Sequence, residues 1–442
     1  MPRNYARWTR VGFPLLVIYL LTMVDRTNIS IAAPDILARL ELTGAATGVV
    51  LSAFFWGYVV TMVPGGALAD RTSAVRVISW ALAVVGITAA LTGIVQSFTL
   101  LLLVRVALGL AEGVIFPAFA VLFLKWFPSR ERGRAVAATT FAVPLSTVIA
   151  APLGGWMIDQ WNYETMFILQ GLPAVIVAII FARIASDDPA TDSRISSAER
   201  ELIISSREAE TEAEGRFRDV IGRPLVWIVG VTYFLWLSGM YGFNLWMPSL
   251  IKTLSQSGIG AVGVLSAIPF ALGGLGLFVN SWMSDRSGLS RGWFIATPLT
   301  LGGIALVVQH YLDFGLVVDM ALLSLAGVGL FAGTGPWWSW MVSLFPKNQA
   351  ATSAGLINVL GNFGGVVAPV VLGLLGGSSG GGSSFYVLGF GLLVAAALVL
   401  GLSGRRGVRT ARPEDGAAAP SSAPGAPVAA SRGGLDRKGA RP

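Results

Sequence analysis

The stretch GGALADRTSAVR, residues 65–76, joins the end of one apolar segment to the start of the next. A shorter copy, SDRSGLSR at 284–291, recurs in the second half of the chain. A second motif is repeated at nearly the same offset, since WFPSRERGRA begins at Trp126 and LFPKNQAATS begins at Leu344. Two landmarks repeated at one offset indicate a duplicated unit, as in transporters whose substrate site lies between two parallel repeats.

Composition points to a membrane protein. The 442 residues are 54% hydrophobic and only 12% charged, whereas soluble domains carry about a quarter charged residues. Apolar runs recur near the ~20 residues that a helix needs to cross a bilayer. The first run follows several arginines like a signal peptide, but it lacks a small-residue cleavage site and is expected to be retained. Twelve helical spans are expected in the lipid bilayer, at 11–33, 45–68, 75–95, 98–124, 134–157, 165–184, 224–250, 260–283, 292–310, 314–343, 350–375 and 384–403.

The distribution of basic residues predicts the orientation. With the N-terminus in the cytoplasm, only Arg39 and Lys252 of the 31 basic residues fall in loops on the outer side. This asymmetry follows the positive-inside rule, so both termini are expected to be cytoplasmic in a plasma (bacterial cytoplasmic) membrane. The net charge of +7 is explained by this bias, and no nucleic-acid partner is expected. The absence of cysteine excludes disulfides and thiolate metal sites.

Four regions are expected along the chain. Residues 1–184 form an amino-terminal six-helix bundle, and residues 224–403 form a carboxy-terminal six-helix bundle. The mixed-sign segment 185–223 is expected to be a solvated, partly helical cytoplasmic linker. The tail at 404–442 is rich in Ala, Pro and Gly and is expected to be a disordered cytoplasmic segment.

Several motifs carry a resemblance to a known family. GGALADRTSAVR resembles the loop signature of the major facilitator superfamily. Within that superfamily, the chain is similar to the anion:cation symporter family, which includes D-galactonate, glucarate and phthalate permeases. The resemblance covers nearly the whole chain except the linker and tail. It implies a twelve-helix major facilitator fold, two six-helix bundles related by a pseudo-twofold axis, and a monomer. The motifs are VDRTNISIAAP (24–34), SAFFWGYVVTMVPGG (52–66), VRVALGLAEGVIFP (104–117) and KWFPSRERGRA (125–135).

Four ionisable side chains lie well inside the expected spans: Asp25, Arg26, Arg105 and Glu112. A charge at the bilayer centre costs at least about 2.5–3.5 kcal/mol by insertion scales, so such residues are functional by default. The plainer interpretation is that they form ion pairs that hold the first bundle together. Adjacent residues on a helix point about 100° apart, so Asp25 and Arg26 are expected to have different partners. The expected pairs are Asp25 with Arg105 and Arg26 with Glu112.

The chemistry of these groups suggests separate roles. A guanidinium offers a planar fork that matches a carboxylate and stays charged, so Arg26 is expected to anchor the carboxylate of a substrate. A buried carboxylate that loses its counter-charge takes up a proton. Glu112 and Asp25 are therefore expected to titrate, with Arg105 completing the proton-coupling set, as the family resemblance also implies. Protons are the expected coupling ion, and sodium is the alternative.

Neutral side chains are expected to complete the substrate site. Tyr58, Trp338 and Ser339 match the family by motif, and the galactonate-like members have an asparagine at the site that matches Asn358. Tyr233 stands where those relatives have glutamine, so a substrate less hydroxylated or more aromatic than a sugar acid is expected. Single aromatic residues in spans more often pack or anchor at the interface. Charges well inside the spans are expected only in the first half, which would leave specificity to the second. Further candidates are Trp56, Tyr241, Asn244, Trp337 and Asn362.

The repeated loops predict a cytoplasmic gate, with a plain topology-setting basic loop as the alternative. His310, the only histidine, is expected at the surface, so a histidine proton relay is not expected. The gate residues are Asp70, Arg71 and Arg76 in the first half, and Asp285 and Arg286 in the second.

The sequence therefore predicts a secondary active transporter that takes up a small organic carboxylate by proton symport. One alternative is a proton-antiport exporter of a drug or natural product, because APLGGW (151–156) partly matches an antiporter signature. A second alternative is a non-transporting anion sensor. No nucleotide loop, metal cluster or nucleophile–base set is visible, so neither an enzyme nor a cofactor is expected.

Overall fold

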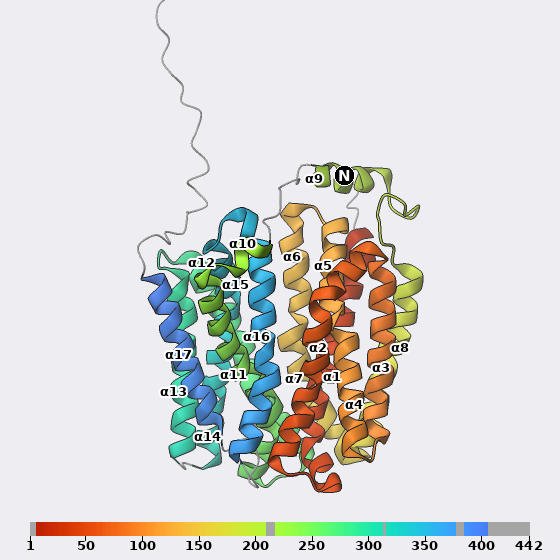
Figure 1. Cartoon of the computed structure of the whole chain (residues 1–442). Coiled ribbons are helices and arrows are strands. Elements are labelled where there is room, and N and C mark those ends of the chain that lie inside the picture. Colours follow the sequence, from red (N-terminus) through yellow and green to blue (C-terminus); the bar gives the residue numbers. More distant parts are fainter. Residues whose placement is uncertain (1–5, 209–216, 313–314, 377–383, 405–442) are drawn as a thin grey trace, which may run out of the picture. The chain divides into compact units, whose positions relative to one another are not determined.

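The computed structural model describes residues 6–208, 217–312, 315–376 and 384–404, and within these ranges the regular elements are helices (Figure 1). The predicted tail, apart from Gly404, lies outside the described residues. The elements are η1 (Trp8–Gly12), α1 (Phe13–Leu40), α2 (Gly44–Arg71), α3 (Ala74–Ile94), α4 (Phe98–Gly113), α5 (Ile115–Trp126), α6 (Ser129–Thr140), α7 (Ala142–Gln160), α8 (Tyr163–Ile184), α9 (Ser197–Glu208), α10 (Phe217–Ile221), α11 (Pro224–Ser255), α12 (Ile259–Arg286), α13 (Arg291–Tyr311), α14 (Leu316–Ala332), α15 (Thr334–Ser343), α16 (Lys347–Gly376) and α17 (Phe385–Ser403).

Twelve helical segments are long and apolar enough to span a membrane, which confirms the expected multi-pass, all-helical fold. Three of these spans are each interrupted once. The fourth span breaks at Val114, between α4 and α5, and the tenth span breaks at Gly333, between α14 and α15. The fifth span breaks at Phe141, between α6 and α7. The first of these breaks follows directly after Glu112, so this carboxylate lies where the regular helix ends.

Short polar residues begin several helices. The side chains of Thr43, Ser73, Ser97 and Asn162 each accept a hydrogen bond from a backbone N–H in the first turn of the following helix. Such caps satisfy donors that have no partner within the helix. The caps therefore set the starts of α2, α3, α4 and α8.

Helix packing repeats in the two halves. In the first half α1 packs on α7, α2 on α4, and α3 on α8. In the second half the corresponding pairs are α11 with α16, α12 with α14, and α13 with α17. The α2–α4 contact requires glycine, because a Cβ at Gly109 would lie 1.9 Å from the backbone oxygen of Phe54. The repeated packing matches the duplication that the two sequence landmarks predicted.

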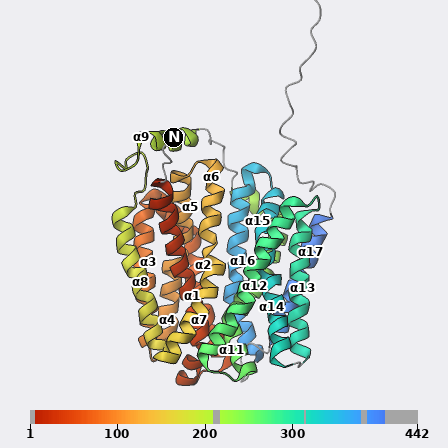
Figure 2. The same ribbon diagram turned by 180° about the vertical axis from the view of Figure 1, so that it is seen from behind.

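The two halves meet through α2 with α16 and through α7 with α12. A Cβ at Gly48 would lie 2.4 Å from the backbone oxygen of Pro369, so α2 and α16 touch through their backbones. Across the second contact, the N–H of Gly260 donates to Asp159 at 2.9 Å. Both contacts involve the ends of the helices farthest from α9 (Figures 1 and 2). The halves are therefore tightly packed at the end of the bundle that is distal to α9.

The segment after α8 is docked on the first half. Glu199 in α9 has only 3% of its surface exposed. Its carboxylate accepts from the backbone N–H of Ala6 at 3.3 Å and of Arg7 at 3.2 Å, and from the Arg7 guanidinium at 2.8 Å. Asp187 accepts from Ser73 and from the first turn of α3. These two carboxylates are therefore bound by the first half, while many other residues of the predicted linker are exposed.

Candidate functional site

The four charged residues of the first half lie on two helices. Asp25 and Arg26 are in α1, and Arg105 and Glu112 are in α4. The Nε of Arg26 donates to the Oε1 of Glu112 at 2.5 Å. The side chain of Glu112 is 2% exposed and that of Arg26 is 15% exposed. The structure thus brings together one of the two expected pairs, in a nearly dry environment where a charge-assisted hydrogen bond is strong.

The second expected pair is not closed. Among the described residues, no ion pair or hydrogen bond joins Asp25 to Arg105, although Arg105 is the charged group that acts most strongly on Asp25. Both residues are buried, with 6% and 1% of their surface exposed. Asp25 Oδ2, Arg105 Nε and Arg105 Nη1 are buried without a hydrogen-bond partner. Burying a charge without a partner is costly, so this arrangement is less favourable than the closed Arg26–Glu112 pair.

An aromatic residue from α2 contacts both guanidinium groups. The ring of Phe54 lies 4.9 Å from the Cζ of Arg26 and 5.5 Å from the Cζ of Arg105. Tyr58, one turn later, lies 4.4 Å from the same Arg26 atom and stacks on Phe54. Such cation–π contacts stabilise a desolvated cation by about 2 kcal/mol. Tyr58 was among the predicted site residues and Phe54 was missed, although the two lie on one helical face.

A second polar group links α11 and α16. The hydroxyl of Tyr241 donates to Asn362 Oδ1 at 2.8 Å, and Asn362 Nδ2 donates to the backbone oxygen of Asn358 at 2.8 Å. The ring of Tyr241 packs against Phe55 of α2, with ring centroids 4.4 Å apart. This contact crosses from the second half to the first. Asn358, one of the predicted substrate residues, is partly exposed in this group.

The remaining predicted substrate residues belong to an aromatic cluster. Tyr233 stacks on Trp337, with ring centroids 5.0 Å apart and planes at 14°, and it is 9% exposed. The ring of Tyr233 is therefore already stacked within the protein, and its predicted effect on the substrate stays a prediction. Trp338 meets the edge of Tyr233 and is 41% exposed. Ser339 is exposed and donates to the backbone oxygen of Pro336. Within the described residues, no hydrogen bond, ion pair or ring contact joins this cluster directly to the charges of the first half.

The expected gate residues of the first half are exposed. Within the described ranges, Asp70, Arg71 and Arg76 form no ion pair with one another. In the second half, Asp285 approaches Arg291 at 3.5 Å, and Arg286 lies over the ring of Trp282 at 4.4 Å. No ion pair in the described ranges joins the two sets of gate residues, so the cytoplasmic gate stays a prediction.

His310 is exposed and packs on Tyr386, with ring centroids 4.4 Å apart. This position agrees with a surface residue outside the charged group.

Sequence reasoning missed two buried polar residues. Asp319 lies in the first turn of α14 and is 2% exposed, so the expectation that buried charges are confined to the first half was wrong. The N-terminus of a helix favours a carboxylate, which accounts for Asp319 there. Asn28 in α1 is fully buried, and neither atom of its amide has a partner. Asn28 lies almost one turn after Asp25, and this spacing was the available signal.

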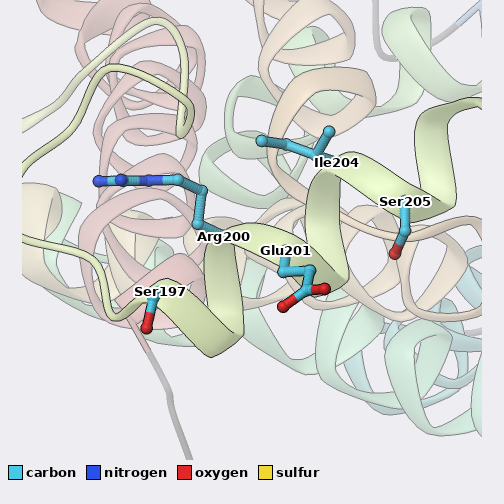
Figure 3. Close-up of a pocket in the computed structure, with 5 residues that line it drawn as sticks. All are labelled: Ser197, Arg200, Glu201, Ile204 and Ser205. Atoms are coloured by element: carbon cyan, nitrogen blue, oxygen red, sulfur yellow. The ribbon is translucent and has the colours of Figure 1, made fainter.

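A surface hollow of about 390 Å³ lies on α9, away from the charged residues of α1 and α4. Figure 3 shows that Arg200 extends away from Glu201 there. Arg200 also donates to the backbone oxygen of Asp192 at 2.7 Å, so it holds the linker together. Arg200 therefore has a structural role at this hollow, and we do not assign the hollow as a substrate site.

The chain matches known transporters over most of its length. A family model described as Major Facilitator Superfamily matches residues 15–369. A protein of Agrobacterium vitis named as a tartrate transporter is 30% identical, over 92% of this chain and 94% of its own length. A protein of Escherichia coli (strain K12) named as a galactarate/D-glucarate transporter is 27% identical, over 86% and 90%. A quinolone resistance transporter of Acinetobacter baumannii is also 27% identical, over 82% and 85%.

The fold matches a solved transporter as well. A bacterial homolog of the human lysosomal transporter Spinster, in an inward-facing and occupied conformation, superposes with a TM-score of 0.70. It is 17% identical, and the match covers 90% of this chain and 96% of that chain. The tartrate and glucarate relatives agree with the predicted resemblance to the anion:cation symporters. The chain belongs to the Major Facilitator Superfamily, and its named relatives are transporters, not enzymes.

Proposed function

We propose that this protein takes up a small organic carboxylate together with protons, by alternating access between its two halves. The observation that carries the proposal is the Arg26–Glu112 pair. Arg26 uses its Nε on Glu112, and within the described part of the chain its two terminal nitrogens make no hydrogen bond to a carboxylate. Those nitrogens can receive a carboxylate in a bidentate arrangement. The names of the tartrate and glucarate relatives support an organic acid as the substrate.

The same pair supplies a coupling mechanism. A substrate carboxylate that binds Arg26 competes with Glu112 for one cation. Glu112 then lies buried without its counter-charge, and its Oε2 already has no hydrogen-bond partner. Protonation removes the cost of an uncompensated buried charge, so substrate and proton bind together. Asp25 is the second titrating group in this proposal, and Arg105 is its counter-charge.

The remaining parts of the proposal concern the movement, orientation and assembly of the chain. Residues 1–184 and 224–403 would move as two bundles about the site, joined by the linker at 185–223. Both termini would lie in the cytoplasm of a bacterial plasma membrane, and the protein would act as a monomer. Protons drive transport in this scheme, with sodium as the alternative ion.

Arg26→Lys tests the anchor. Lysine keeps the charge but loses the planar fork, so carboxylate binding should weaken markedly. The matched control is Arg39→Lys, because Arg39 pairs with Glu164 and Tyr163 outside the site. Purified proteins in sealed vesicles would be assayed for uptake of labelled tartrate and D-glucarate under a pH gradient or a sodium gradient. If the Arg26 variant transports as well as the control, Arg26 does not anchor the substrate.

A second candidate is a proton-antiport exporter of a drug, which the 27% identity to a quinolone resistance transporter supports. The same vesicles distinguish the two, because an antiporter would move a quinolone against the proton gradient and would not accumulate tartrate. Vesicles that bind a carboxylate but move neither compound would instead indicate the anion sensor.

A further inference from the structure

The second half contains a chain of three hydrogen-bonded side chains outside the charged group. Tyr241 lies on α11, and Asn362 and Asn358 lie one turn apart on α16. Asn362 is the central member and is 4% exposed. Its Oδ1 accepts from the Tyr241 hydroxyl at 2.8 Å, and its Nδ2 lies 2.8 Å from the backbone oxygen and 3.2 Å from the Oδ1 of Asn358.

The direction of this chain is determined by the backbone. A carbonyl oxygen can only accept, so the Asn362 atom facing the backbone of Asn358 must be the amide nitrogen. The Oδ1 of Asn362 must then face Tyr241, whose hydroxyl must donate. The second hydrogen of the same nitrogen is available for the Oδ1 of Asn358. Asn362 therefore uses both hydrogens of its amide nitrogen within the protein and has no donor left for a ligand.

The direction of these hydrogen bonds determines how the amide of Asn358 is oriented. Its Oδ1 is held toward Asn362, so its Nδ2 points the other way. Asn358 is partly exposed, and within the described part of the chain its Nδ2 donates no hydrogen bond. A free asparagine could turn its amide over and offer either an acceptor or a donor. Here Asn362 and Tyr241 fix the amide, so that Asn358 offers the donor.

We propose that Tyr241 and Asn362 are positioning residues that fix the amide of Asn358 so that it presents an N–H donor to the substrate. The site then selects carboxylates that carry an acceptor oxygen, such as hydroxy acids. It disfavours the deoxy analogue, which leaves the donor unpaired, and the amino analogue, whose ammonium group is itself a donor. This inference rests on the proposed function, because it assumes that Arg26 holds the carboxylate.

The hydrogen-bonded chain approaches Arg26 through Tyr241 and the aromatic residues of α2. Tyr241 packs on Phe55 of α2, and the preceding residue, Phe54, lies over Arg26. Arg26 is also the charged group that acts most strongly on the Tyr241 hydroxyl. Gly365 allows α16 to approach Phe55 of α2 closely, because a Cβ at this position would lie 2.3 Å from the ring of Phe55. The carboxylate anchor and the start of the donor chain therefore meet where the halves touch.

Three four-carbon diacids provide the test. Tartrate carries two hydroxyls, succinate carries none, and aspartate carries an ammonium group. Binding to the purified full-length protein would be measured by calorimetry. The parent should bind tartrate up to about tenfold more tightly than succinate, as one neutral hydrogen bond allows, and should bind aspartate most weakly.

Asn362→Leu keeps the volume of the side chain but removes the amide. Asn358 can then turn over and accept from an ammonium group, so the tartrate-to-aspartate affinity ratio should fall toward one. The tartrate-to-succinate ratio should persist in this variant, because a hydroxyl can donate as well as accept. Succinate affinity, which depends on Arg26, should be unchanged. Tyr241→Phe keeps the ring on Phe55 and should shift the tartrate-to-aspartate ratio in the same direction by less, which covers a failure of the leucine variant to fold. The control is Asn280→Leu, because Asn280 donates to two backbone carbonyls elsewhere in the second half and should leave the ratio unchanged.

The outcomes separate this inference from the proposed function. Equal binding of tartrate and succinate by the parent overturns the inference, as does a tartrate-to-aspartate ratio that neither variant changes. If both diacids bind and Arg26→Lys weakens both, the proposed anchor stands even when the inference fails. If the parent binds none of the diacids, or binds them independently of Arg26, the anchor and the inference both fail.

Discussion

Glu112→Gln is the substitution that most directly separates binding from coupling. Glutamine keeps the shape of the side chain and an oxygen that can accept from the Nε of Arg26. It removes the negative charge and the group that can take up a proton. Because Glu112 is 2% exposed, no solvent compensates for either change.

Two magnitudes follow from the geometry. In the parent, the substrate must displace a 2.5 Å charge-assisted hydrogen bond from Arg26. Such bonds contribute about 1.5–3 kcal/mol, so the glutamine variant should bind a carboxylate about tenfold or more tightly. Whereas substrate binding should become tighter, the coupling of uptake to proton movement should be lost. Symport of one proton with one negative charge allows about tenfold accumulation per pH unit, because a pH unit corresponds to about 1.36 kcal/mol. Without the proton site, the accumulation ratio should fall to about one.

The assay compares two modes of transport in the same vesicles. Gradient-driven uptake needs a proton to move with the substrate, whereas counterflow with equal substrate on both sides needs no net proton movement. The variant should fail in the first assay and retain the second. Glu164→Gln is the matched control, because Glu164 pairs with Arg39 at the end of the bundle distal to α9.

If the variant accumulates substrate as well as the parent does, Glu112 does not carry the proton, and Asp25 becomes the candidate for that role. Loss of counterflow together with weaker binding would refute the competition itself. It would mean that Glu112 positions Arg26 for the substrate rather than competing with it. In either case, the Arg26–Glu112 pair would remain as a structural ion pair.

Three further predictions concern the linker and the contact between the halves. Glu199→Ala should leave two backbone N–H groups and a guanidinium unpaired, so hydrogen exchange in α9 should speed up while uptake is unchanged. Hydrogen bonds from Arg194 hold the pKa of Asp192 below its usual value, so this stabilisation is present above about pH 4 and lost as the pH falls through the lowered pKa. Asp192→Asn should abolish that part of the acid sensitivity in thermal unfolding. Gly48→Ala would place a Cβ 2.4 Å from the Pro369 oxygen, so cysteines introduced across α2 and α16 should cross-link more slowly in this cysteine-free chain.

The sequence predicted the fold well because the signals are local and repeated. Twelve apolar runs must each satisfy their backbone internally, and only helices do so in a bilayer. The repeated loop and Phe-Pro motifs predicted the duplication, and helix packing follows the same repeat. The interruption after Glu112 was not predictable. Residues 98–124 read as one apolar run, and hydropathy does not distinguish a continuous helix from two helices joined at Val114.

The candidate site was predictable only in part, because pairing depends on the distance between helices. The signs of the charges and the directions of the two spans led to the expectation that Arg26 meets Glu112, and the structure agrees. The same reasoning expected Asp25 to meet Arg105, but Phe54 lies over both guanidinium groups and no ion pair forms between those two residues in the described ranges. The spacing of Asn358 and Asn362 is visible in the sequence. The direction of their hydrogen bonds depends on Tyr241, which comes from another helix.

The two halves carry different chemistry, and this difference links specificity to coupling. The anchor and the proposed proton sites are on α1 and α4, whereas the amide that would read the substrate is on α16. A ligand can engage both only while the halves are close together, as they are where Phe55 packs on Tyr241. A carboxylate without the correct acceptor would still displace Glu112 and load the proton, but it would gain nothing from the second half. In this scheme the wrong substrate is rejected at the closing step rather than at first binding, so selectivity should be sharper in transport rates than in affinities.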